Sequence, residues 1–165
     1  MYPDPKRVLQ MGNGVLYIMG KPAGFENLHD DISHLSRNGI THIVSLLETS
    51  EADELGLSQE EALSDDVDIN YRQLPIQDRS TPDSPQDFIA LVSESYAQIL
   101  DGAHLVAHCR AGIGRSGIFT TAVLIHHGLT VDDAFEAVSV ARGFRIPDTQ
   151  SQIDWIQAHA SSIAA

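Results

Sequence analysis

The chain alternates short apolar runs with longer amphipathic segments. Short apolar or alternating runs that end at turn-forming residues are typical of strands, and this pattern occurs at residues 14–19, 40–47, 68–76 and 104–108. Between these runs, apolar residues recur three and four positions apart, as on one face of a helix. Strand–helix–strand units favour parallel pairing. We therefore expect a single α/β domain over residues 1–165, with a central, mainly parallel sheet of four or five strands and helices on both faces.

Capping signals mark where three helices begin. A hydroxyl residue followed three positions later by an acidic or amide residue is typical of a helix N-terminus, and the chain has Ser84 with Asp87, Thr130 with Asp133 and Thr149 with Gln152. These pairs predict helices over residues 84–101, 130–141 and 149 to the C-terminus. A further helix is expected over residues 117–127.

The segment between Glu48 and Asp68 is strongly acidic and contains nine carboxylates. Its leucines on either side of Gly56 predict one or two short helices packed at the edge of the sheet. Two interpretations of the carboxylates stay open: a face that docks another protein, or ordinary solvated surface.

The formal net charge is −13 at pH 7, which argues against non-specific binding to nucleic acid or anionic membranes. No run approaches the roughly 20 apolar residues of a membrane span, and residues 1–7 lack the apolar stretch of a signal peptide. We expect a cytoplasmic protein, and the oligomeric state is left open. Several arginines are nonetheless expected in or beside one pocket, as a locally basic mouth, with scattered surface charge as the alternative for about half of them: Arg72, Arg79, Arg110, Arg115, Arg142 and Arg145.

The densest chemistry lies between a predicted strand and a predicted helix, in residues 108–117, which read HCRAGIGRSG. Gly112 and Gly114 can adopt the positive φ values that a loop needs to wrap around an oxyanion. The following helix N-terminus favours negative charge, so Cys109 is expected to be a thiolate and a nucleophile at neutral pH. The plain alternative is a strand–turn–helix corner with a buried cysteine.

Two side chains complete the expected cradle. Arg115 can bind two phosphate oxygens with its planar fork, and Ser116 places a hydroxyl beside the sulfur. Successive backbone N–H groups would hold the phosphate, so the predicted phosphate-binding residues are Arg110, Ala111, Gly112, Ile113, Gly114 and Arg115.

This constellation resembles the signature of the protein tyrosine phosphatase superfamily, which is His-Cys, five residues, then Arg-Ser/Thr. His108, Cys109, Arg115 and Ser116 match it. Residues 14–156 are similar to the small dual-specificity phosphatases, especially the kinase-associated branch. The resemblance implies a phosphoprotein substrate, a phosphocysteine intermediate, no metal and no cofactor. It also implies that His108 braces the loop and tunes the thiolate.

A phosphate ester cleaved by a thiolate needs an acid to protonate its leaving oxygen. In the family this acid comes from a loop before the cysteine, and the run at residues 75–83 resembles that loop. Asp78 is the preferred acid and would later act as the base, while Asp83 is the alternative and is better explained as a charge near a helix N-terminus. Gln152 resembles a water-positioning glutamine of some relatives, although its capping role explains it equally well.

The predicted function is hydrolysis of phosphotyrosine, and also of phosphoserine and phosphothreonine, because the aromatic-bearing insert of strictly tyrosine-specific relatives is not recognisable. Phosphoinositide phosphatases of the superfamily place lysines in the cradle, whereas this chain has basic Arg110 but apolar Ile113. A nucleic-acid phosphatase would need a basic surface. A non-catalytic phosphoprotein-binding module is the remaining alternative. Cys109 is the only cysteine, which excludes an internal disulfide and a multi-cysteine zinc site.

Overall fold

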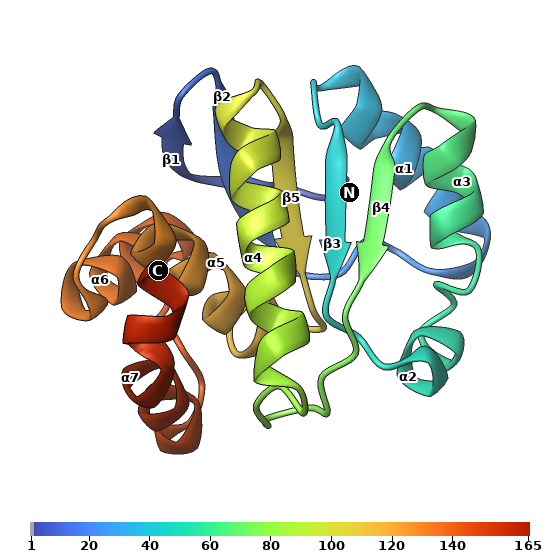
Figure 1. The fold of residues 1–165 in the computed structure, drawn as a ribbon. Coiled ribbons are helices and arrows are strands. Elements are labelled where there is room, and N and C mark those ends of the chain that lie inside the picture. The colour runs from blue at the N-terminus through green and yellow to red at the C-terminus, as the bar shows by residue number, and fades with distance from the viewer. Residues whose placement is uncertain (1) are drawn as a thin grey trace.

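The computed structural model describes residues 2–165 and gives one α/β layer structure (Figure 1). The strands are β1 (Lys6–Met11), β2 (Gly14–Met19), β3 (His42–Ser45), β4 (Asn70–Gln73) and β5 (His104–His108). The helices are a 3-10 turn η1 (Phe25–Asn27), α1 (Leu28–Arg37), α2 (Thr49–Glu54), α3 (Glu60–Asp66), α4 (Pro85–Leu100), α5 (Arg115–His127), α6 (Val131–Arg142) and α7 (Gln150–Ala164). The strands are ordered β1-β2-β5-β3-β4.

The predicted parallel sheet is confirmed. Strands β2, β5, β3 and β4 run parallel, so their carboxyl ends meet at one edge, where open α/β sheets bind ligands. Strand β5 lies between β2 and β3, and its residues Leu105, Val106 and Ala107 are buried. The residue that follows β5 is therefore held at the centre of that edge.

Strand β1 was not predicted. It pairs antiparallel with β2 at the outside of the sheet and carries an irregularity between Arg7 and Leu9. Strand β1 begins with charged residues and is only partly buried, because it lies at the outside of the sheet. The apolar pattern of its sequence is therefore weak. Gly12 and Asn13 join the two strands, with Gly12 at φ +59°, and this two-residue turn is the hairpin signal that could have identified it.

Helices cover the sheet on both sides. In Figure 1, α4 crosses in front of the strands, α5, α6 and α7 lie to its left, and α1 lies behind β3 and β4. Helix α5 is the central one, and its residues 115–125 are all buried. Phe88 of α4 meets Phe119 of α5 and Trp155 of α7 edge to face, with ring centroids 6.2 and 5.1 Å apart. This packing fixes the position of the α5 N-terminus.

The predicted caps are confirmed. Backbone N–H groups at the third helical position donate to hydroxyls: Asp87 to Ser84 at 3.2 Å, Asp133 to Thr130 at 3.1 Å and Gln152 to Thr149 at 3.2 Å. The acidic segment forms the two short helices α2 and α3. Within residues 2–165, no helix is both long and apolar enough to cross a membrane.

Candidate active site

The carboxyl end of β5 carries the predicted nucleophile. His108 is the last residue of the strand, Cys109 follows it, and Arg115 is the first residue of α5. Cys109 is 3% exposed, and its Sγ lies 3.2 Å from the Ser116 hydroxyl. The loop between the strand and the helix therefore encloses the sulfur, as the sequence predicted.

The two loop glycines serve different needs. Gly112 has φ +75°, and a Cβ there would lie 2.4 Å from the Met19 carbonyl oxygen. Both the conformation and the space therefore require glycine. The positive φ predicted for Gly114 is wrong, because its φ is −77°. Its constraint is space, since a Cβ would approach Gln152 Nε2 to 3.0 Å.

The surroundings of Cys109 favour its charged form. Burial by itself raises the pKa of a thiol, but it is outweighed here. Hydrogen bonds from the Ser116 hydroxyl and backbone N–H, the charge of Arg115 and a backbone hydrogen bond from Gly112 together lower the Cys109 pKa below its ordinary value. The buried sulfur is thus surrounded by groups that favour its ionised form.

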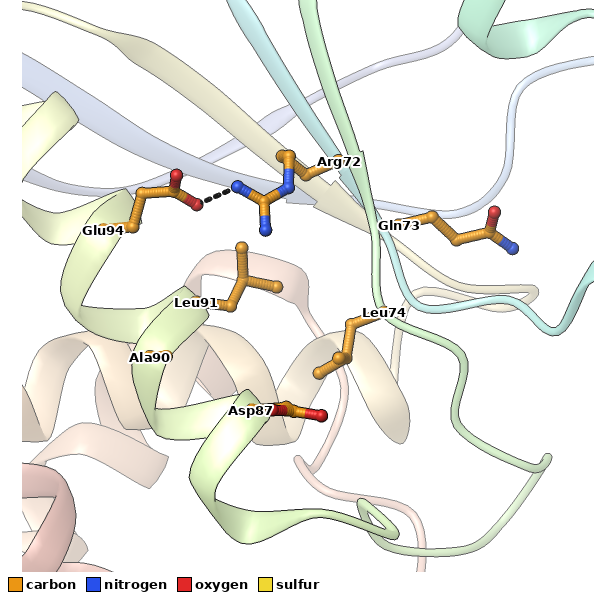
Figure 2. A pocket seen from close by; sticks show the side chains of 7 residues that line it. All are labelled: Arg72, Gln73, Leu74, Asp87, Ala90, Leu91 and Glu94. Atoms are coloured by element: carbon orange, nitrogen blue, oxygen red, sulfur yellow. Dashed lines mark hydrogen bonds and ion pairs between the residues drawn. The ribbon is translucent and has the colours of Figure 1, made fainter.

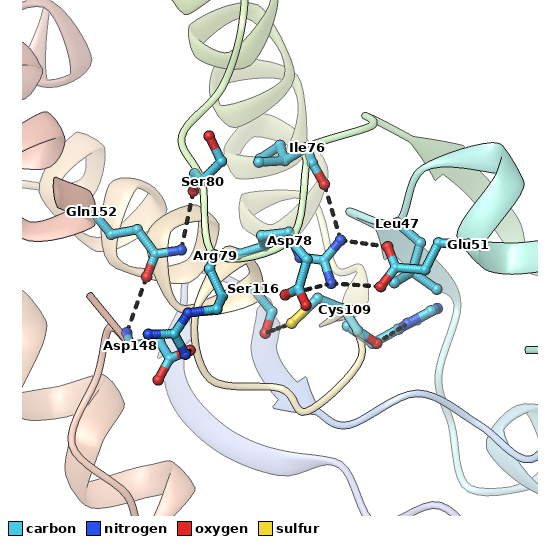
Figure 3. A network of polar contacts seen from close by, with 12 residues as sticks. Leu47, Glu51, Ile76, Asp78, Arg79, Ser80, Cys109, Ser116, Asp148 and Gln152 are labelled. Carbon is cyan, nitrogen blue, oxygen red and sulfur yellow. Dashed lines mark hydrogen bonds and ion pairs between the residues drawn. The ribbon is translucent and has the colours of Figure 1, made fainter.

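Arg115 is 2% exposed and is held by groups from two other segments, α2 and the loop after β4, whose Glu51, Ile76 and Asp78 are labelled in Figure 3. Glu51 of α2 accepts from Nη1 at 2.7 Å and from Nη2 at 3.0 Å, so the pair is bidentate. The Ile76 carbonyl also accepts from Nη1, at 2.9 Å. Hydrogen bonding to Arg115 lowers the pKa of Glu51. Glu51 was missed from the sequence, because nothing in a run of nine carboxylates marks one as the partner of Arg115.

Asp78 lies at the mouth of the same network. Its Oδ1 is 3.2 Å from Arg115 Nη2, and its side chain is 58% exposed. The four hydrogen bonds that Arg115 makes to Glu51, Ile76 and Asp78 are all donated by its Nη1 and Nη2 atoms. Asp83 is exposed and lines a separate hollow with Ser84 and Asp87. The geometry therefore brings Asp78, and not Asp83, to the cradle.

Gln152 joins two loops above the cradle. Its Nε2 donates to the Ser80 carbonyl at 3.0 Å, and its Oε1 accepts from the backbone N–H groups of Asp148 and Thr149, each at 3.1 Å. The capping role is thus confirmed, and a water-positioning role stays a prediction. Arg79 donates to Asp148 at 3.0 Å across the same gap. These contacts tie the loop that carries Asp78 to the N-terminus of α7.

His108 takes part in a buried ion pair below the loop. Its Nε2 lies 2.6 Å from Glu60 Oε2, its Nδ1 lies 3.1 Å from the Cys109 carbonyl, and both side chains are at most 1% exposed. Burial lowers the pKa of a histidine, but the charge and hydrogen bond of Glu60, with the Cys109 carbonyl, raise the His108 pKa above 6.5. A protonated ring donates from both nitrogens. Glu60 was also missed from the sequence.

The pocket around Cys109 has a volume of about 220 Å³. Its lining residues are Asp78, Arg79, Cys109, Arg110, Ala111, Ile113, Gly114, Arg115 and Asp148. The basic mouth predicted from six arginines is therefore built by three of them. Of the other three, Arg145 lines an adjacent hollow, and Arg142 donates to the loop from outside the pocket.

The assignment of Arg72 to this mouth is wrong. Arg72 lies on the outer strand β4 and pairs with Glu94 of α4 across a different groove (Figure 2). The groove has a volume of about 410 Å³ and shares no lining residue with the pocket around Cys109. Residues 70–73 alternate about the strand, so the Arg72 side chain points to the helix side and not to the carboxyl edge.

A buried cysteine in a backbone cradle, with an arginine fork and a carboxylate at its rim, at the carboxyl edge of a parallel sheet, is the arrangement typical of cysteine-based phosphatases. Residues 18–129 match the family model described as polymorphic toxin system, DSP-PTPase phosphatase. The chain belongs to this dual-specificity-type phosphatase family, as the resemblance in the sequence implied.

Curated relatives support the family. The chain is 33% identical to human dual specificity protein phosphatase 15 over 121 residues, which cover 72% of this chain and 36% of that protein. It is 31% identical to the mouse protein over 142 residues, covering 84% and 54%. The chain thus spans between about a third and a half of the length of these relatives.

Solved structures share the fold. The crystal structure of kinase associated phosphatase, with its catalytic cysteine replaced by serine, covers 100% of this chain and 98% of its own, at a TM-score of 0.89 and 17% identity.

Among residues 2–165, no group of three or more histidine, cysteine, aspartate or glutamate side chains has the arrangement of a metal site.

The buried pair of His108 and Glu60 predicts a pH-dependent contribution to stability. Because the His108 pKa is raised in the folded state, this contribution is complete below its ordinary value of 6.5 and is lost as the pH rises through the folded value. We expect Glu60→Gln to lower the free energy of unfolding by roughly 2 kcal/mol at pH 6 and by less as the pH rises, measured by urea unfolding from pH 6 to 9. Exposed Glu61→Gln is the control, and a difference that grows toward alkaline pH would contradict the pairing.

Proposed function

We propose that this protein is a cysteine-dependent phosphomonoesterase that dephosphorylates phosphotyrosine, phosphoserine and phosphothreonine in proteins. The observation that carries the proposal is the Cys109 sulfur, which has a lowered pKa and lies 3.2 Å from the Ser116 hydroxyl at the base of a pocket that Arg115 also lines. A thiolate so placed faces any phosphate that the loop amides hold.

The first step is transfer of the phosphoryl group to sulfur. Cys109 attacks phosphorus, the S–P bond forms, and the bond to the leaving oxygen breaks. The loop N–H groups and Arg115 stabilise the equatorial oxygens. Asp78 gives its proton to the leaving oxygen. In the free site Asp78 bonds to Arg115 Nη2, so an incoming phosphate takes its place on the fork and leaves Asp78 facing the leaving group.

The second step is hydrolysis of the phosphocysteine. Asp78, now a carboxylate, takes a proton from water, whose oxygen attacks phosphorus and releases the Cys109 thiolate. The Ser116 hydroxyl, 3.2 Å from the sulfur, donates to that departing thiolate. Glu51 keeps the guanidinium of Arg115 fixed through both steps by its bidentate contact.

The shape of the pocket supports activity on more than one phosphorylated side chain. Of the described residues that line it, none is aromatic, so a phosphotyrosine ring gains no stacking contact, which is typically worth about 0.5–1.5 kcal/mol. With a volume of about 220 Å³, the pocket does not require the phosphate to be carried on a side chain as long as tyrosine. Aliphatic phosphoesters are therefore not placed at a disadvantage by binding.

Replacement of the nucleophile tests the proposal directly. We expect wild type to hydrolyse an aryl phosphate and Cys109→Ser to lose this activity, because a serine hydroxyl in the same place remains un-ionised at neutral pH. Equal rates for the two proteins would contradict an enzymatic role. A stopped reaction analysed by mass spectrometry should show the phosphoryl adduct on Cys109 in wild type.

Replacement of the predicted acid separates Asp78 from Asp83. We expect Asp78→Ala to lower kcat by about 10²–10⁴ while the Kd for vanadate stays within a few fold, since removing its carboxylate frees Arg115 Nη2. Asp83→Ala is the matched control and should retain kcat. If Asp83→Ala is instead the crippling change, the acid has been wrongly assigned.

Comparison of substrates tests the substrate class. We expect kcat/KM for phosphotyrosyl and phosphothreonyl peptides to exceed that for inositol phospholipid vesicles by roughly tenfold or more. Phosphate release is the measurement for all three. Preference for the lipid would overturn the protein substrate and leave the phosphatase chemistry intact.

A further inference from the structure

Arg142, the last residue of α6, contacts the back of the cradle (residues 109–115). Its Nη2 donates to the Ala111 carbonyl at 2.9 Å, and its Nε donates to the Gly112 carbonyl at 3.0 Å. The guanidinium also lies over the Phe144 ring, 5.0 Å from its centroid. It therefore neither lines the pocket nor pairs with a surface carboxylate, the two roles that its position in the sequence suggested.

The contacts of Arg142 decide which way two peptide groups point. In a planar trans peptide the C=O and the N–H point in opposite directions. The Ala111 carbonyl shares its peptide with the Gly112 N–H, and the Gly112 carbonyl shares its peptide with the Ile113 N–H. An arginine that holds both oxygens outside the loop therefore turns both N–H groups toward its inside.

A third carbonyl of the loop is held in the same way. The Lys21 N–H, just beyond β2, donates to the Arg110 carbonyl at 3.1 Å. Three consecutive carbonyl oxygens of the cradle are thus bound from outside, the first by backbone and the next two by a single guanidinium. Gly112 at φ +75° makes the bend between them possible.

The chain of contacts ends at the reacting atom. Arg142 binds the Ala111 oxygen, and the N–H of that same peptide, on Gly112, is one of the groups that lower the pKa of Cys109. A cation on the oxygen of a peptide polarises its N–H and strengthens the bond that it donates. The positive charge thus acts through the backbone on a sulfur that the side chain does not touch.

We propose that Arg142 is a positioning residue for the phosphatase reaction, which orients and polarises the Gly112 and Ile113 N–H groups toward the sulfur and the phosphate oxygens. The inference rests on the proposed function, because an oriented cradle matters only if an oxyanion binds there. A purely structural role would stabilise the fold without changing either the affinity for anions or the ionisation of the thiol.

The test compares Arg142→Met, which keeps a long stem but removes the fork, with Arg142→Lys, which keeps the charge and offers a single ammonium. We expect Arg142→Met to weaken vanadate binding by roughly tenfold or more and to shift the pH profile of Cys109 alkylation by iodoacetate to higher pH. Arg142→Lys should fall between wild type and Arg142→Met in both measurements.

Arg145→Met is the control for the loss of one nearby positive charge. Arg145 is exposed and lies three residues further along the chain, so we expect its vanadate Kd and alkylation profile to remain within twofold of wild type. An Arg142→Met protein that unfolds at lower temperature but binds vanadate and alkylates like wild type would overturn the inference. If wild type itself binds no vanadate and releases no phosphate, the proposed function fails instead.

Discussion

The burial of Cys109 among groups that favour its ionised form is the constraint on which the rest of this structure depends. A negative charge on a sulfur so nearly inaccessible to water has to be balanced by protein groups, because an uncompensated buried ion is strongly unfavourable. The balance comes from backbone N–H groups, the Ser116 hydroxyl and Arg115. Arg115 is itself buried and needs its own partner, which Glu51 provides. His108 and Glu60 repeat this arrangement one layer below. Acidic and basic side chains thus alternate from the sulfur into the body of the domain.

The sequence predicted the features that depend on neighbours along the chain. The strand, loop and helix at residues 104–127, the three capping pairs and the parallel sheet follow from local spacing and were confirmed. Residues 108–117 contain the sulfur, its cradle and its arginine in a single run, so the centre of the site could be recognised without tertiary information. The family comparisons agree with that recognition.

What the sequence did not reveal depends on contacts between distant segments. Glu51 lies 64 residues from Arg115 and Glu60 lies 48 residues from His108, and among nine carboxylates in one acidic segment no local pattern distinguishes these two. The direction of Arg142 was hidden for the same reason, since the carbonyls that it binds lie about 30 residues earlier. Strand β1 and the φ of Gly114 were misjudged because edge pairing and close approach are set by partners that one-dimensional spacing does not record.

The acidic segment, residues 48–68, both forms exposed surface and supports the site around Cys109. Helices α2 and α3 turn most of their carboxylates outward, yet each also contributes one that is directed inward. The segment joins β3 to β4, and surface connections of this kind are common choices for inserting a tag or exchanging a loop. Any graft that keeps the two strands but discards these helices would leave Arg115 with Asp78 as its one carboxylate partner among the described residues and His108 without Glu60. The part of the domain that looks most replaceable therefore sets a limit on how it can be redesigned.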